Sequence, residues 1–206
     1  MPRRTRKARN GRRRVRLTWY VPPMERTHPT LIVISGPSGA GKTTLAHRLA
    51  RRIGCPAICR DEIKEGMVLA APGFEPSPGD ELTRRTLPAF FAILRLLLEA
   101  GVTTVAEAAF QDHVWRPNLE PLRDLAHIKV LQCSVDTELA RQRSDRRAAS
   151  SPTRKAHADA HPESESLRRS FRRLAIDVPS IDVDTTDGYV PSLDVIASFV
   201  TGPQAA

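Results

Sequence analysis

The chain has 206 residues, enough for one domain with a full hydrophobic core and too few for two sizeable domains. Its formal net charge of +9 comes from residues 1–23, which hold nine Lys or Arg and no Asp or Glu, because 23 basic and 23 acidic residues follow from Met24 onward. The balanced charge of the domain argues against a polyanion-binding surface on it, and the lack of a roughly 20-residue apolar stretch or signal-type core predicts a cytoplasmic protein without a membrane span.

The first predicted segment is a basic N-terminal extension, residues 1–29. Its run from Arg3 to Arg16 lacks apolar periodicity, and we expect it to be disordered on its own. Three interpretations are open: an electrostatic arm for RNA, DNA or an acidic membrane, a solvated extension without a role, or sequence that precedes a natural start at Met24. A single domain covering residues 30–206 follows the extension.

Residues 31–50 place a phosphate-binding loop between a predicted strand, 31–34, and a predicted helix, 42–53. The sequence GPSGAGKT between them has the Walker A spacing GxxxxGK[ST]. Glycines let backbone N–H groups wrap around phosphates, Lys42 adds a charge at the β- and γ-phosphates, and the Thr43 hydroxyl can ligate Mg²⁺. The alternative, an ordinary Gly-rich turn, does not require this order of strand, loop and helix. The predicted nucleotide-binding residues are Gly36, Pro37, Ser38, Gly39, Ala40, Gly41, Lys42, Thr43 and Thr44.

Strands and helices alternate through the rest of the chain. We predict strands at residues 56–59, 102–106, 128–135 and 181–183, and helices at 62–70, 81–100, 116–126, 136–149, 163–175 and 193–200. Residues 71–80 and 150–162 are predicted loops, rich in Pro, Gly and polar residues. Five strands separated by helices predict an α/β fold with an open parallel sheet and right-handed crossovers. Ligands bind such a sheet at the carboxyl ends of its strands.

Two carboxylates follow strands at this edge. Asp61 comes after the second strand, where it could accept a proton from a substrate hydroxyl and position it for in-line attack on the γ-phosphate. The alternative is a helix N-cap, and one residue could fill both roles. Glu107 ends the third strand beside the loop, where a carboxylate can hold Mg²⁺ or contact the substrate, although an isolated carboxylate at a strand end is commonly only solvated.

A basic helix follows the fourth strand. Arg143 and Arg147 lie four residues apart on one helical face, with Arg141 and Arg146 beside them. We predict that Arg143 and Arg147 belong to a lid, residues 137–162, that closes over the transferring phosphate; Arg154, Lys155 and His157 would extend it. The alternative is a solvated basic face.

The three cysteines are Cys55, Cys59 and Cys133. Their odd number, without CxxC spacing or a paired His arrangement, argues against disulfides and structural zinc. We interpret them as buried thiols.

The motifs resemble a family of small AAA-type P-loop kinases that includes polynucleotide kinase, chloramphenicol phosphotransferase and zeta-toxin-like enzymes. The resemblance covers roughly residues 30–200 and rests on GPSGAGKTT, CRDEIKE, VAEAAF, CSVDTELARQRSDRR and IDVDTTDG. It implies a three-layer α/β/α P-loop NTPase fold, nucleoside-monophosphate-kinase-like, with Asp61 as the base and Arg143 and Arg147 as lid arginines. It also implies that the loop after IDVDTT lies near the nucleotide base. The long lid loop and the basic extension depart from the family pattern.

The predicted function is an ATP- and Mg²⁺-dependent transfer of the γ-phosphoryl group to a hydroxyl of a small-molecule or nucleotide-like acceptor. Two alternatives remain. One is a polynucleotide 5′-hydroxyl kinase that contacts nucleic acid through the extension, and the other is a regulatory ATP-binding protein that transfers no phosphate. The sequence does not identify the acceptor or the oligomeric state.

Overall fold

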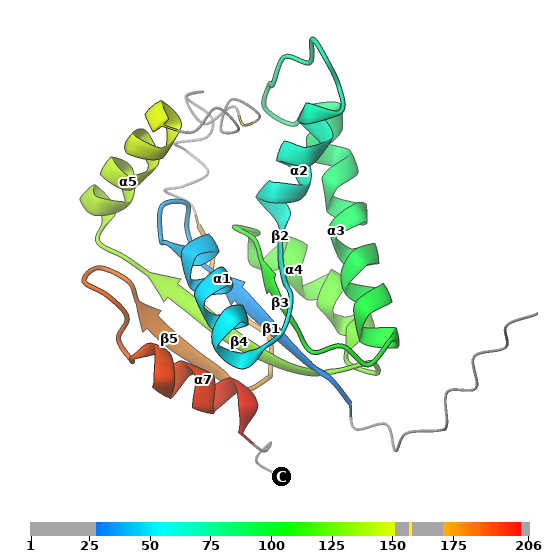
Figure 1. Ribbon diagram of the computed structural model, residues 1–206, viewed down its shortest axis with the longest axis vertical. Coiled ribbons are helices and arrows are strands. Elements are labelled where there is room, and N and C mark those ends of the chain that lie inside the picture. Colours follow the sequence, from blue (N-terminus) through cyan, green and yellow to red (C-terminus); the bar gives the residue numbers. More distant parts are fainter. Residues whose placement is uncertain (1–27, 151–156, 158–170, 203–206) are drawn as a thin grey trace, which may run out of the picture.

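The computed structural model describes residues 28–150, 157 and 171–202, and its centre is a parallel sheet (Figure 1). The described strands are β1 (Thr30–Ser35), β2 (Ala57–Cys59), β3 (Thr104–Glu107), β4 (His127–Ser134) and β5 (Ser180–Asp184). They lie in the order β2-β3-β1-β4-β5, and every neighbouring pair is parallel. The predicted five-stranded parallel sheet is therefore confirmed, with strand ends that differ from the prediction by one or two residues.

Helices cover both faces of the sheet, α1 and α7 on one and α3 and α4 on the other (Figure 1). The described helices are α1 (Lys42–Ile53), α2 (Arg60–Leu69), α3 (Glu81–Glu99), α4 (Asp112–Leu119), the 3₁₀ turn η1 (Glu120–Leu122), α5 (Thr137–Ser150) and α7 (Leu193–Thr201). Within the described ranges, none of them is long and apolar enough to cross a membrane.

The core lies on both sides of β1, because successive side chains of a strand point to opposite faces. Ile32 and Ile34 pack under α1 and α7, whereas Leu31 and Val33 pack under α3 and α4, and all four are fully buried. Because β1 is buried on both faces, its sequence is an unbroken run of apolar residues, and this run is the pattern from which the strand was predicted.

The helix predicted at 116–126 is displaced toward the N-terminus. Helix α4 begins at Asp112. Trp115 and Leu119, four residues apart, lie on the same face of this helix and are fully buried against the core. The α-helix ends at Leu119 because Pro121 lacks the N–H that a further turn needs, and a 3₁₀ turn follows.

The helix predicted at 163–175 is wrong over the part that the structure describes. Residues 171–175 are irregular, and residues 163–170 lie outside the described chain. The backbone N–H groups of Arg172 and Ala175 donate to Gln111 Oε1 (2.7 Å) and Asp112 Oδ1 (2.8 Å) at the start of α4, while Leu174 is buried in the core. Side-chain acceptors on α4 therefore replace the helical hydrogen bonds of this segment. Also outside the description are residues 1–27 of the basic extension and, except for His157, residues 151–162 of the predicted lid.

Candidate nucleotide and phosphoryl-transfer site

The phosphate-binding loop, residues 36–43, connects β1 to α1 at the carboxyl edge of the sheet. Two of its glycines sit against backbone from other elements. A Cβ at Gly36 would lie 2.5 Å from the carbonyl oxygen of Cys133, and one at Gly39, where φ is +84°, would lie 2.3 Å from that of Ala140. The loop thus fits tightly between β4 and the first turn of α5, and side chains at these positions would displace one of them.

Helix α1 begins at Lys42, within the last two residues of the loop. Its N-terminus, the positive end of the helix dipole, is directed at the loop, and no acidic residue in its first turn opposes that field. The Lys42 side chain is buried, and its Nζ donates to the carbonyl of Pro37 at 2.8 Å. The loop backbone, the helix end and the ammonium group together form an arrangement that suits anion binding.

Glu107 is the carboxylate at the centre of this edge. It ends β3, opposite Ile34 of β1 on one side and Cys59 of β2 on the other. Its side chain accepts a hydrogen bond from Thr43 Oγ1 at 3.0 Å and lies 3.8 Å from Lys42 Nζ. Burial is the main cause that raises the pKa of Glu107, and the charge of Asp61 raises it further, against the opposing effects of Lys42, Thr43 and Arg147. The ionised form of this carboxylate is disfavoured by burial, and a bound cation would stabilise it. Together, the carboxylate and the neighbouring Thr43 hydroxyl form a set of oxygen donors that fits Mg²⁺.

Asp61 lies in the first turn of α2, not before it. The helix starts at Arg60 with Cys59 as its N-cap, because β2 passes into α2 without a connecting residue. The alternative role of Asp61 as N-cap is therefore wrong. Asp61 Oδ1 accepts from Arg60 Nη1 at 3.0 Å, its side chain is 37% exposed, and its charge acts on Glu107. The structure thus brings Asp61 to the same edge as the phosphate-binding loop.

The predicted lid arginines, Arg143 and Arg147, lie on the face of α5 that is directed toward the phosphate-binding loop. Arg143 Nη2 donates to the carbonyls of Thr185 and Thr186 at 3.0 and 3.1 Å, and the charge of Arg147 acts on Glu107. Arg141 instead pairs with Glu138 and Asp145 on the exposed side. A cavity of about 410 Å³ lies here, lined by Gly41, Thr44, Arg48, Arg143, Arg146, Arg147, Thr185, Gly188 and Tyr189.

The loop after β5 contributes Thr185, Gly188 and Tyr189 to the lining of this cavity. Thr185 Oγ1 lies 3.0 Å from the carbonyl of Ala40 and so ties the loop to the phosphate-binding loop. Arg48 and Tyr189 were missed by the sequence analysis; the Arg48 guanidinium lies 5.2 Å from the centre of the Tyr189 ring. Arg48 follows Thr44 by four residues, so helical spacing could have found it, whereas the approach of Tyr189 depends on the return of the chain after β5.

Comparison with known proteins gives a family and a fold. A family model described as an AAA domain matches residues 31–174. No curated protein matches the chain. A Chloroflexus aurantiacus protein, described as a candidate kinase, shares 21% identity and a TM-score of 0.75 over 86% of this chain and 100% of its own.

Two further solved structures share the fold at lower identity. Kti12 from Chaetomium thermophilum, in complex with ADP-AlF3, is 16% identical with a TM-score of 0.61, over 84% of this chain and 100% of its own. The Mycobacterium tuberculosis APS kinase CysC, in complex with AMPPNP and APS, is 15% identical with a TM-score of 0.55, over 83% of this chain and 94% of its own. The predicted three-layer α/β/α P-loop NTPase fold is confirmed.

Proposed function

The chain belongs to the AAA domain family, and from this premise we propose that it is an ATP- and Mg²⁺-dependent phosphotransferase that moves the γ-phosphoryl group to a hydroxyl of a small-molecule or nucleotide-like acceptor. The observation that carries the proposal is that four side chains lie near one another at the carboxyl edge of the sheet: Lys42, Thr43, Glu107 and Asp61. A triphosphate cradle alone serves switches and motors as well as kinases. A second carboxylate, Asp61, is partly exposed and its charge acts on the buried Glu107, which supports transfer to an acceptor.

The proposed roles follow from the positions of the side chains. Lys42 and the loop amides bind the β- and γ-phosphates, and the cavity lined by Arg48 and Tyr189 takes the nucleoside. Thr43 and Glu107 hold Mg²⁺, which would neutralise charge on the phosphate oxygens. Burial suits Glu107 to this task, since a cation removes the cost of its desolvated charge.

Asp61 is proposed as the base. It accepts the proton of the acceptor hydroxyl while the acceptor oxygen bonds to the γ-phosphorus and the bond from that phosphorus to the β–γ bridging oxygen breaks, which leaves ADP. Arg147, whose charge acts on Glu107, would stabilise the charge on the transferring group, and Arg143 donates to the loop at Thr185.

The acceptor would lie between α2 and the lid. His157, the described residue of the lid loop, has its side chain buried and its Nε2 3.3 Å from Oε1 of Glu65 on α2. This contact brings residue 157 of the proposed lid against the helix that carries Asp61 and supports an acceptor position beside α2. A polynucleotide 5′-hydroxyl acceptor, bound through the basic extension, is the alternative outcome of the same test.

The test is a transfer screen with γ-labelled ATP against nucleosides, nucleotides, oligonucleotides, sugars and other alcohols. Asp61→Asn should bind ATP normally but lose transfer by about 10²- to 10⁴-fold, the usual contribution of a general base. Lys42→Ala should weaken ATP binding, and Asp124→Asn, at an exposed site, is the matched control. Normal transfer by Asp61→Asn would remove Asp61 as the base. ATP binding without transfer to any acceptor would favour a regulatory protein.

A further inference from the structure

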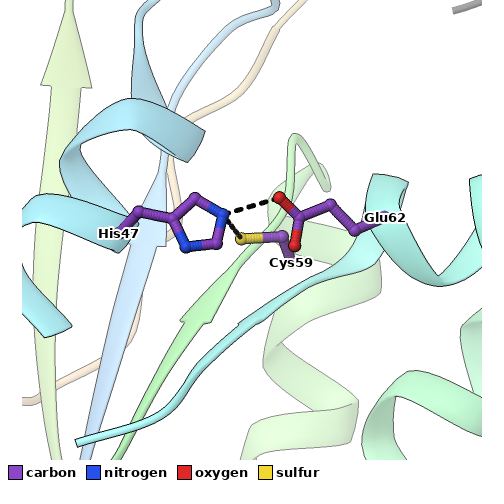
Figure 2. A group of neighbouring side chains, drawn as sticks. All are labelled: His47, Cys59 and Glu62. Carbon is purple, nitrogen blue, oxygen red and sulfur yellow. Dashed lines mark hydrogen bonds and ion pairs between the residues drawn. The ribbon is translucent and has the colours of Figure 1, made fainter. Parts of the chain in front are cut away.

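Three side chains of residue types that can bind metal ions lie close together beside the proposed phosphoryl-transfer site, each from a different element (Figure 2). His47 comes from the second turn of α1, Cys59 from the end of β2 and Glu62 from the first turn of α2. Their ligand atoms all lie within 4.8 Å of one another. The cysteine spacing argued against structural zinc and did not reveal this group, because β2 must pair with β3 before Cys59 reaches α1.

One imidazole nitrogen makes both contacts in the group. His47 Nε2 lies 2.6 Å from Glu62 Oε1 and 3.7 Å from Cys59 Sγ (Figure 2). A proton relay to a nucleophilic thiol needs the two ring nitrogens to face different partners, and here both partners face one nitrogen. Burial, together with the charges of Glu107, Glu62 and Asp61, raises the pKa of Cys59, which disfavours a free thiolate nucleophile. Three potential ligand atoms this close to one another suit a cation instead.

We propose that His47, Cys59 and Glu62 bind a thiophilic divalent cation of the Zn²⁺ type that links α1 to the first turn of α2. The Sγ–Nε2 distance of 3.7 Å is close to the roughly 3.6 Å that tetrahedral Zn–S and Zn–N bonds impose. The Nε2–Oε1 distance has to open from 2.6 Å to about 3.3 Å. Both of these side chains are close to half-exposed, at 40% and 46%, so a small rotation of Glu62 provides the opening and solvent can supply a fourth ligand.

The chemistry of the donors separates this site from the proposed Mg²⁺ site. Thr43 and His47 lie one helical turn apart on the same face of α1, and their partners Glu107 and Cys59 face each other across the β3–β2 pair. The two sites are therefore neighbours. Oxygen donors at Thr43 and Glu107 suit Mg²⁺, whereas a sulfur and an imidazole nitrogen select a softer cation. The carboxylates that disfavour the Cys59 thiolate attract a cation, whose binding releases the thiol proton.

Metal binding by the full chain tests this proposal independently of any kinase activity. Zn²⁺ titration in excess Mg²⁺ should give one site, with one proton released from the thiol and an affinity that rises up to about tenfold per pH unit. Co²⁺ should show thiolate-to-metal charge transfer in the near ultraviolet. Cys59→Ala should abolish that band, and His47→Gln and Glu62→Gln should each weaken binding by at least about tenfold. Cys55→Ser, four residues before Cys59, is the matched control and should bind normally.

The outcomes that would overturn the proposal are equally distinct. Wild-type affinity in Cys59→Ala, or Co²⁺ binding without charge transfer, would mean that the thiol is no ligand. Loss of Zn²⁺ binding in Glu107→Gln with retention in Cys59→Ala would place the cation at the Mg²⁺ site. His47→Gln and Glu62→Gln change partly exposed surface side chains, so they keep the test informative if Cys59→Ala does not fold.

Discussion

The substitution Asp80→Asn should destabilise the domain by removing the charge from a buried ion pair. Asp80 Oδ2 lies 2.8 Å from Lys64 Nζ, and both side chains are almost fully buried, at 4% and 3% exposed. The pair joins α2 to the start of α3, where Asp80 also caps the helix by accepting from the Thr83 N–H at 2.6 Å. Because Asn caps a helix about as well as Asp, the substitution isolates the charge.

The magnitude follows from the pKa of Asp80. Burial alone would raise this pKa, but hydrogen bonds from Lys64 and Thr83 outweigh burial and lower it from 3.8 to about 2. At about 1.4 kcal/mol per pKa unit, the ionised side chain contributes about 2–3 kcal/mol to the free energy of unfolding. Asp80→Asn also leaves the Lys64 charge buried without a counter-charge, which brings the expected loss to about 3–5 kcal/mol.

Urea unfolding at pH 7 measures this loss, with Asp194→Asn as the control. Asp194 pairs with Arg52 in an exposed bridge, so its loss should cost no more than about 1 kcal/mol. Since the folded state lowers the pKa of Asp80, its contribution is full above about pH 4 and is lost as the pH falls through about 2. A cost below about 1 kcal/mol for Asp80→Asn would refute the reasoning.

Three further predictions concern the loop, the metal site and a buried lysine. Gly39→Ala should weaken ATP binding by tenfold or more in calorimetry, because its Cβ meets backbone 2.3 Å away; Gly73→Ala, with a similar φ of +80° but open space, should not. Glu107→Gln should raise the Mg²⁺ concentration needed for transfer by about 10- to 100-fold, because the carboxylate proposed to hold the cation is lost. Lys129→Met should cost about 1–3 kcal/mol in urea unfolding and leave transfer unchanged, because Nζ donates to three carbonyls at the end of α7.

Local sequence patterns were sufficient to predict those helices, strands and loops whose structure depends mainly on their own residues. The phosphate-binding loop and α1 were predicted from spacing and apolar periodicity, and α1 runs from Lys42 to Ile53 as expected. The parallel sheet followed from the alternation of strands and helices. The same patterns failed at residues 171–175, where charged residues at helical spacing favour a helix but acceptors on α4 bind the backbone instead.

The candidate site divides in the same way. Asp61 and Glu107 could be assigned to the carboxyl edge of the sheet, because every parallel strand delivers its following residue there. The N-cap role of Asp61 could not be judged, since it depends on whether a residue separates β2 from α2. Arg143 and Arg141 look alike in sequence, yet only the packing of α5 decides which of them faces Thr185 and which faces solvent.

The sequence by itself determined the phosphate-binding loop of this protein, because such a loop is built from consecutive residues whose backbone conformation is local. The tertiary structure alone decided which distant side chains join it: Glu107 with Thr43 across β3 and α1, and His47 with Cys59 and Glu62 across three elements. The reason is physical. Side chains far apart in sequence converge only after strand pairing and helix packing fix their positions, and no periodicity within one segment carries that information.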